Sequence, residues 1–545
     1  MRYRMALVAL SVLVISSLIL GCGGTKQEIQ KTQAVKQLQQ GGKLVIGSLQ
    51  EPNMLNPLLS DLLATAEVAN LLFSGLIVMN DKGQWLPDLA VEVPTTSNGG
   101  VSPDGLTVTY KLRSGVTWHD GTPFTAEDVK FTWQVIMDPQ NKVVSREGYD
   151  KIIAVDTPDK QTVVLRFREL YAPYMTLFST VLPKHVLSVQ GELAKAAFNR
   201  APIGTGPFKF RDWSIAEAIT LEANPSYHRG RPALDTIIYR VIPEMTILLT
   251  QLKAGELDIV SNIALSQIEQ VKALDGIRTV ITTNLIWEHL AFNQDQVMFK
   301  DARVRQAVMA AIDRQAIVNL VLKNAATVAV TDQHPLSWAY NQAVSSPVRD
   351  VNRARELLTQ AGWILGTDGI FVKDGQKLSF TLSTTASNKM REAAGSLIVQ
   401  QLKEAGILAE VQLVDVLAFF GDTLKNRRFE AAMYAWVTGP DPDNYTFWHS
   451  RQIPGRSSGY EGQNYSGWNN PEVDQLTERG RRTVNLEERK QIYYRLQDLV
   501  VQEAPVVPLY FRSTIDAVKM TVANYSPNPA PAGQMWNAWQ WGFTK

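Results

Sequence analysis

Short runs of apolar residues, or of alternating apolar and polar residues, predict β-strands along the whole chain. Residues 107–112 and 162–167 alternate clearly, and each run follows a polar turn. A period of two places every second side chain on the same face of a sheet, so one face of each run can pack against a core. The predicted strands are residues 43–47, 107–112, 162–167, 378–382 and 409–413.

Longer segments with apolar residues mostly three or four positions apart predict helices between these strands. In residues 486–503 the apolar positions include Ile492, Leu496 and Leu499. Thr125 is followed three positions later by Asp128, which predicts a capping box at the start of a helix. Strands and helices mix without a fixed repeat, so we predict an α/β (mixed α+β) fold. The other predicted helices are residues 301–322, 352–361, 389–405 and 486–503.

The first 42 residues have the pattern of an export signal followed by a spacer. Two arginines precede an apolar run that is too short to span a bilayer comfortably. The next residues, Ile19-Leu20-Gly21-Cys22, resemble the bacterial lipobox, in which the cysteine is lipidated and a signal peptidase cuts before it. We therefore predict a signal peptide over residues 1–21, a lipid on Cys22 and a flexible tether over residues 22–42. An ordinary N-terminal membrane anchor is the alternative interpretation.

Composition and charge favour an exported globular protein. The 545 residues include 54 basic and 53 acidic ones, a net charge of +1, and they contain no dense basic run, which argues against a nucleic-acid partner. Cys22 is the single cysteine, so a mature chain lipidated at this residue has no disulfide and no thiolate metal site. We predict no cofactor and no metal.

The sequence lacks the motifs of several common enzyme classes. It has no His-Glu-x-x-His, no Gly-x-Ser-x-Gly and no phosphate-binding loop, and no two of its six histidines are spaced three or four residues apart. His119 and Asp120 are adjacent, so their side chains diverge and the pair is interpreted as structural. Residues 204–206, Gly-Thr-Gly, are interpreted as a backbone turn where two segments cross. No catalytic residue is predicted, although the acidic residues leave a hidden carboxylate pair open.

Several separated segments carry recognisable motifs. The longest is residues 112–129, Leu-Arg-Ser-Gly-Val-Thr-Trp-His-Asp-Gly-Thr-Pro-Phe-Thr-Ala-Glu-Asp-Val. Together the segments resemble the bacterial extracellular solute-binding proteins of the peptide/nickel class (family 5), which are receptors for ABC importers. The resemblance covers nearly everything from about residue 43 to the C-terminus. The shorter segments, in the order of that family, are residues 202–208, 290–293, 301–307, 311–314, 467–474 and 504–510.

The resemblance implies a two-lobed, periplasmic-binding-protein-like fold with hinge strands and an extra subdomain in the first lobe. Lobe I would comprise residues 43–290, with the subdomain at about residues 81–200. Lobe II would comprise residues 291–507, and residues 508–545 would return to lobe I. Closure of the lobes over a ligand would deliver it to the permease and ATPase of the importer. The receptor would act as a monomer outside the cytoplasm, held to the membrane by its lipid.

The resemblance also implies a ligand-contact strand at residues 435–442. Oligopeptide and dipeptide receptors place an aspartate three residues after its tryptophan, or four before its last proline, to pair with the α-ammonium of a peptide. In this chain those positions are Gly439 and Thr438, so the anchor is missing. Asp441 or Asp443 would substitute for it, unless Asp441 braces the turn. The predicted ligand-binding residues are Trp287, Asn293, Trp436, Val437, Thr438, Asp441 and Asp443.

The predicted function is the capture of short peptides for an ABC importer. An oligosaccharide is an alternative ligand, because Trp287, Trp436, Trp448 and Trp468 fall in or near segments expected to line the cleft. A nickel chelate is another, although nickel needs convergent histidine or carboxylate ligands and the sequence shows no histidine cluster. A surface hydrolase and a signalling or adhesion module are the rivals from other classes.

Overall fold

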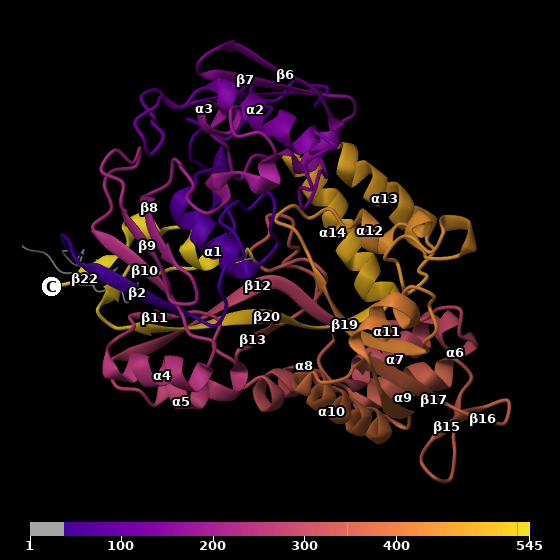
Figure 1. Ribbon diagram of the computed structural model, residues 1–545. Helices are drawn as coiled ribbons and strands as arrows, with labels where there is room; N and C mark the ends of the chain where they lie inside the picture. Colours follow the sequence, from indigo (N-terminus) through magenta and orange to yellow (C-terminus); the bar gives the residue numbers. More distant parts are fainter. Residues whose placement is uncertain (1–37, 346, 531) are drawn as a thin grey trace, which may run out of the picture. The chain divides into compact units, whose positions relative to one another are not determined.

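One large mixed sheet organises the described part of the chain, which comprises residues 38–345, 347–530 and 532–545 of the computed structural model (Figure 1). The predicted signal segment, Cys22 and residues 22–37 of the predicted tether lie outside the described residues. The sheet has 11 strands, ten of which follow one another while β13 pairs with β20. In sheet order the strands are β18 (Leu408–Val414), β17 (Ser379–Thr385), β19 (Ala431–Val437), β12 (Ile277–Phe292), β20 (Val506–Lys519), β11 (Ile259–Val260), β2 (Lys43–Ser48), β10 (Thr236–Val241), β9 (Ala218–Ala223) and β8 (Phe208–Ser214), with β13 at Ala326–Val328.

Strands β12 and β20 form a long antiparallel pair that joins the two halves of this sheet. The C-terminal part of β12 pairs with β19, whereas the C-terminal end of β20 pairs with β11. Their register shifts between Thr283 and Trp287, which marks a bulge where a strand bends more easily. Residues 38–545 form one compact unit, so the boundaries of the two lobes remain a prediction.

Helices cover the sheet largely as the sequence predicts. Residues 389–405 and 486–503 are helical over the predicted ranges, and the capping box at Thr125 and Asp128 is present. Helices α4, α5, α8 and α10 lie along one face of the sheet (Figure 1). No helix of the described residues is long and apolar enough to cross a membrane. The helices are α1 (Leu63–Leu72), α2 (Ala126–Met137), α3 (Lys184–Leu187), α4 (Met245–Ala254), α5 (Ile268–Lys272), α6 (Val297–Lys300), α7 (Ala302–Ala311), α8 (Arg314–Ala316), α9 (Val351–Gln360), α10 (Lys389–Ala405), α11 (Val416–Ala418), α12 (Tyr445–Trp448), α13 (Pro471–Arg482) and α14 (Leu486–Glu503).

The single long helix predicted over residues 301–322 is wrong. Helix α7 ends at Ala311, Ile312 is extended, and a new turn begins at Asp313. The Asp313 side chain accepts a hydrogen bond from the N–H of Ala316, and its own N–H donates to Gln401. An aspartate that caps a new helix competes with continuation of the old one, which hydrophobic spacing alone does not reveal.

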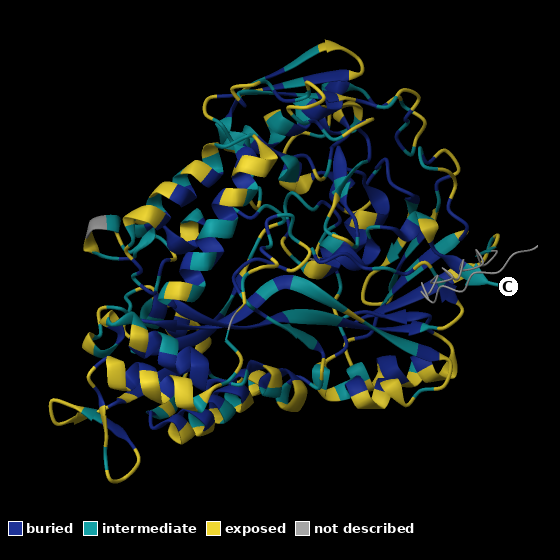
Figure 2. Cartoon of the chain, turned by 180° about the vertical axis from the view of Figure 1, so that it is seen from behind, coloured by how far each residue is buried: buried dark blue, intermediate teal, exposed yellow. Residues whose placement is uncertain are grey.

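Smaller sheets surround the large one. Strands β5 (Thr107–Lys111), β7 (Thr162–Phe167) and β6 (Ile152–Asp159) form a sheet with its own hydrophobic cluster, made by residues between Leu76 and Val181. Figure 2 shows buried strands inside the molecule and exposed residues on the outer faces of the helices. The other strands are β1 (Leu38–Gln39), β3 (Ile77–Met79), β4 (Trp85–Pro87), β14 (Ile364–Leu365), β15 (Phe371–Lys373), β16 (Gln376–Lys377), β21 (Val522–Ala523) and β22 (Gly542–Thr544).

The predicted tether is shorter than expected at its C-terminal end. It was predicted to reach residue 42, but Leu38 and Gln39 form strand β1, which pairs with β22 near the C-terminus. Gly41 donates a backbone hydrogen bond to Ala233. A pairing between the two ends of the chain leaves no local pattern in the sequence.

The turn predicted at residues 204–206 is confirmed as a close backbone crossing. Gly206 donates its N–H to the carbonyl of Leu72, at the end of α1. A Cβ atom on Gly204 would lie 1.8 Å from the oxygen of Leu72, which no side-chain rotation can relieve. His119 braces the turn, since its Nδ1 accepts the N–H of Gly204 and its Nε2 lies 3.1 Å from the carbonyl of Gly206. Burial lowers the pKa of His119 to about 4, so its ring is neutral.

Substitution of Gly204 by alanine is expected to destabilise the protein by at least about 2 kcal/mol, because two backbone segments must separate. Thermal and urea unfolding of the purified variant measure this change. Gly421→Ala is the matched control, because a Cβ there meets nothing within 4 Å, and it should leave stability unchanged or slightly raised. Equal stabilities of the two variants would contradict the crossing.

Candidate ligand-binding site

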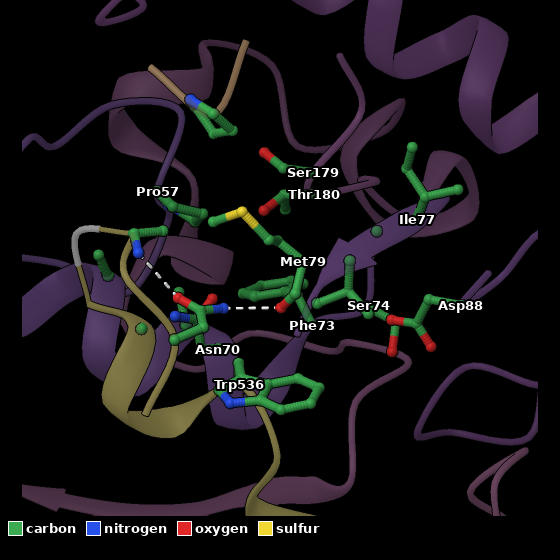
Figure 3. A pocket seen from close by; sticks show the side chains of 18 of the residues that line it. Pro57, Asn70, Phe73, Ser74, Ile77, Met79, Asp88, Ser179, Thr180 and Trp536 are labelled. Carbon is green, nitrogen blue, oxygen red and sulfur yellow. Dashed lines mark hydrogen bonds between the residues drawn. The ribbon is translucent and has the colours of Figure 1, made fainter. Parts of the chain in front are cut away.

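A cavity of about 400 Å³ lies between α1, strands β3 and β4, and the C-terminal segment of residues 528–539. This volume falls in the range of small-molecule sites. Figure 3 shows Asn70, Phe73, Met79 and Trp536 gathered around it. The lining residues are Pro57, Ala66, Ala69, Asn70, Phe73, Ser74, Gly75, Ile77, Val78, Met79, Trp85, Asp88, Thr176, Ser179, Thr180, Pro207, Tyr227, Pro440, Asn528, Ala530, Gly533, Trp536 and Trp539.

Hydrogen bonds between distant segments hold the walls of this cavity. Asn70, on α1, donates to the carbonyl of Ala532 at 2.9 Å. Asn528 donates to the carbonyl of Met79, in β3, at 2.7 Å. The C-terminal segment is therefore fixed against both α1 and the hairpin of β3 and β4.

Aromatic rings form part of the apolar wall of the cavity. Phe73, Trp85, Tyr227, Trp536 and Trp539 all line it. The two C-terminal tryptophans meet edge to face, with ring centroids 5.6 Å apart, and Trp536 donates its indole N–H to Ser526. Rings fixed in this way offer rigid faces to a ligand at little conformational cost.

The cavity offers a ligand no free charge. Among the described residues that line it, Asp88 alone is an acid or a strong base. Its carboxylate lies 2.7 Å from Nε2 of His228 and 3.1 Å from Nε of Arg229, so it is already neutralised. The described residues also contain no group of three or more histidine, cysteine, aspartate or glutamate side chains that could hold a metal ion. A ligand here is held by shape, ring faces and neutral polar groups.

The predicted contact strand reaches the edge of this cavity. Pro440 lines it, and with Met79 it also lines a smaller adjoining hollow. Thr438, Gly439 and His334 face this second hollow. Burial lowers the pKa of His334 to about 4, so this group adds no charge near neutral pH.

Trp287 and Trp436 occupy a packed aromatic cluster. They are 0% and 5% exposed, their ring centroids lie 5.6 Å apart, and Trp436 stacks on Phe447 at 4.4 Å. Trp448 and Trp468 belong to the same buried cluster. None of these four tryptophans is among the residues that line the cavity or the adjoining hollow.

Of the next two predicted residues, Val437 lies at the surface and Thr438 anchors the strand. Val437 is 60% exposed, whereas Thr438 donates both its N–H and its hydroxyl to the carbonyl of Leu285. Thr438 thereby fixes the end of β19 to β12 and still faces the adjoining hollow.

The polar groups of Asp441, Asp443 and Asn293 are engaged inside the protein. Asp441 forms a two-pronged ion pair with Arg489, at 2.7 and 2.6 Å, and both side chains are buried. Asp443 lies 3.3 Å from Arg481, and burial raises its pKa. The Asn293 amide donates to the carbonyls of Arg427 and Phe429. Asp441 therefore braces the turn, which is one of the two roles that the sequence left open.

Sequence reasoning missed Asn70, Trp85, Trp536 and Trp539 as cavity residues. The two C-terminal tryptophans lie three residues apart in a segment rich in proline, glycine and asparagine, without strand or helix periodicity. Large aromatic residues in an irregular segment do not belong to the buried face of a helix or strand. Their presence there was the only indication in the sequence that they line a cavity. Asn70 and Trp85 carry no comparable signal, since their neighbours come from distant parts of the chain.

Comparisons with known proteins agree with this architecture. Residues 85–455 match the model of the bacterial extracellular solute-binding proteins, family 5 Middle. The oligopeptide-binding protein AppA of Bacillus subtilis is 32% identical to this chain over 100% of both chains. The structure of AppA in complex with a nonapeptide has a TM-score of 0.66 at 31% identity, covering 93% of this chain and 100% of that one. NikZ from Campylobacter jejuni, in complex with Ni(L-His), has a TM-score of 0.69 at 27% identity, covering 92% and 99%.

The mixed α/β fold and these relatives define the class: a two-lobed substrate-binding receptor of an ABC importer, which binds its solute and is not an enzyme. The chain belongs to the bacterial extracellular solute-binding proteins of family 5. Its family works outside the cytoplasm.

Removal of the Asp441 carboxylate is expected to destabilise the fold, because Arg489 would be left buried without a partner. Asp441→Ala should lower the free energy of unfolding by about 3–5 kcal/mol, and the double variant with Arg489→Met should recover much of it. Glu472→Ala, which breaks the exposed pair with Arg495, is the control and should cost about 1 kcal/mol or less. Urea unfolding measures all four proteins. Unchanged stability with weakened ligand binding would instead make Asp441 a ligand anchor.

Proposed function

We propose that this receptor captures short peptides and delivers them to its ABC importer by closure of its lobes. The observation that carries the proposal is the 400 Å³ cavity, which presents aromatic rings and neutral polar groups but no free charge. The name of the AppA relative, an oligopeptide-binding protein similar over its whole length, supports a peptide as the ligand.

A cavity of this kind can accommodate peptides of varied amino-acid sequence. Ser74, Thr176, Ser179 and Thr180 offer hydroxyl groups that both donate and accept hydrogen bonds. Water can fill the volume that a small side chain leaves empty and can adapt its own hydrogen bonds. Peptide main-chain groups would be recognised by these partners and by Val437 and Thr438 at the adjoining strand. Trp287, Trp436 and Asn293 would support that strand from behind.

Lobe closure is the second part of the proposal. Lobe I would contain residues 43–290 and 508–545, and lobe II residues 291–507. The register shift between Thr283 and Trp287 supports a hinge there, because it falls on the strand pair that joins the two halves of the sheet. The receptor would work as a monomer whose ligand is released when the importer reopens the lobes.

Membrane attachment through Cys22 is the third part. The lipobox-like segment at residues 19–22 supports it. A receptor tethered by a lipid stays close to its permease, which raises its effective concentration there.

The peptide ligand is tested by mass spectrometry of molecules that co-purify with the protein from its native host, followed by calorimetry. Because Gly439 and Thr438 stand where related receptors place the amine-binding aspartate, acetylation of the peptide N-terminus should weaken binding by less than about 10-fold. A charge-assisted hydrogen bond contributes about 1.5–3 kcal/mol, or roughly 10- to 150-fold. A loss of about 100-fold or more would show that another carboxylate binds the terminus. Co-purification of a glycan or a nickel chelate, with no peptide binding, would overturn the peptide proposal.

Cys22→Ser is expected to abolish lipid attachment, because the serine hydroxyl is not the acceptor of the lipid. The variant should appear in the soluble fraction or retain its signal segment, as fractionation and intact mass show. Ser17→Ala, in the same segment, is the control and should fractionate like the wild type. A Cys22→Ser protein that fractionates and migrates like the wild type would rule out the lipid anchor.

A further inference from the structure

Two buried carboxylates beside α1 lack the cation that buried acids usually have. Glu67, on α1, is 1% exposed, and Asp516, on β20, is 0% exposed. No lysine, arginine or histidine of the described residues forms an ion pair with either one. Their hydrogen-bond donors are all neutral. A buried carboxylate without a cation is costly, so this pair needs a separate explanation.

Asn262 links the two acids. Its side-chain amide donates to Oε1 of Glu67 and its backbone N–H donates to Oδ1 of Asp516, both at 3.0 Å. It does this from a left-handed backbone conformation with a φ of 58°, which is uncommon for a residue other than glycine. Tyr239 donates to Glu67 at 2.6 Å and Tyr525 to Asp516 at 3.0 Å. Strained backbone at a polar site is frequent where a ligand binds.

A second, smaller cavity opens against Glu67. Its volume is about 150 Å³, and Glu67, Ser48, Ser261 and Asn262 supply its polar wall. The hydroxyl of Ser261 is buried and lines this cavity. It forms no hydrogen bond of ordinary geometry, but it lies near enough to Glu67 to lower the pKa of that carboxyl. The hydroxyl oxygen of Ser261 and the carboxylate of Glu67 both have room to accept hydrogen bonds from a further donor in this cavity. The remaining lining residues are Leu49, Gln50, Leu63 and Ala64.

The shape and chemistry of this cavity fit an alkylammonium group. An ammonium has three donors, enough for Glu67, Ser261 and one further oxygen, and its alkyl stem suits Leu63 and Ala64. A volume of about 150 Å³ holds a group of about six heavy atoms, as in known engineered cavities of that size. The half-charge at the N-terminus of α1 opposes a cation, but it is smaller than the full charge of Glu67, the carboxylate that lines the cavity.

We propose that this cavity is a specificity pocket for a primary alkylammonium group, the side chain of a lysine in a bound peptide. The inference rests on the proposed peptide function and names a preference within it. Both cavities lie on α1: Ala66, Ala69 and Asn70 line the large one, and Leu63, Ala64 and Glu67 the small one. Gln534, next to cavity residue Gly533, donates to Asn262 at 3.3 Å and connects the acid pair to the wall of the large cavity.

Protonation of the acid pair predicts that the affinity of the site depends on pH. Burial raises the pKa of Asp516 to about 7, with the charge of Glu67 adding to the shift, and burial also raises the pKa of Glu67. The charge of Arg278 lowers the pKa of Tyr525, the donor to Asp516, but Arg278 forms no ion pair with either carboxylate. An incoming ammonium lowers both pKa values and expels the proton. Affinity should therefore rise as the pH increases through about 7, with protons released on binding.

The direct test uses n-butylammonium chloride and its neutral match, 1-butanol, with the folded full-length protein at pH 8. Ligand-observed NMR should give butylammonium an affinity at least about 10-fold higher than that of the alcohol. Glu67→Gln should remove this advantage, whereas Glu256→Gln, an exposed acid of the same half of the sheet, should retain it. Ala64→Leu, which fills the cavity and keeps both acids, should block butylammonium as well. Equal affinities for the two probes, or an advantage that survives Glu67→Gln, would overturn the proposal.

Peptides separate this inference from the function on which it rests. Trilysine should bind more tightly than trinorleucine to the wild type, by about 10-fold or more, and equally to Glu67→Gln. Calorimetry in phosphate and Tris buffers should show proton release between pH 6 and 7. If peptides bind without a lysine preference, the peptide function stands and the pocket proposal falls. If butylammonium binds through Glu67 and no peptide binds, the alkylammonium site stands, and both the peptide function and the assignment of the site to a peptide lysine fall. A pH-independent affinity would also contradict the pocket.

Discussion

The antiparallel pairing of β12 with β20 is the constraint on which the rest of the structure depends. These two strands carry hydrogen bonds to both halves of the large sheet, so each half is positioned by the same ladder. Glu288 fixes the pair from one side: its buried carboxylate accepts hydrogen bonds from Arg391, at the start of α10, and from Arg512, on β20. One carboxylate thus holds a helix and two strands at the point where the ladder is irregular. The proposed hinge needs such a combination, since its strands must bend while they stay paired.

Neutralised charge is the common property of the ligand site. Asp88 is matched by His228 and Arg229, and Asp441 by Arg489. Each ion pair connects segments that are distant in sequence. Because the charges compensate each other, the pairs produce only a weak electrostatic field at a bound ligand. Selection at the large cavity then depends on shape and ring faces. Groups of that kind discriminate weakly between side chains, which is consistent with the proposed capture of varied peptides.

The sequence predicted the elements of the fold better than it predicted the site. Helices at residues 389–405 and 486–503 were predictable, because each has regular apolar spacing and a clear end. The break at Asp313 was not, since it depends on Gln401, which belongs to a different helix. Trp436 illustrates the same limit at the site. Its motif located the correct strand, but whether the ring faces a cavity or a core depends on Phe447 and Trp448, which only the folded chain brings against it.

Glu67 and Asp516 differ from the buried acids that form ion pairs. Glu288, Asp441 and Asp88 each have a guanidinium within ion-pair distance, which is how a buried carboxylate usually supports a fold. Glu67 and Asp516 have hydroxyl and amide donors alone, and burial raises the pKa of both carboxyl groups, so that a proton can take the place of the missing cation. A proton can be exchanged for a ligand, whereas a guanidinium built into the core cannot. Glu288, Asp441 and Asp88 therefore hold the framework with a cation in place. Asp332 is also buried with neutral donors alone, from Asn444 and Trp448, but it lines neither cavity, whereas Glu67 lines the small cavity beside α1.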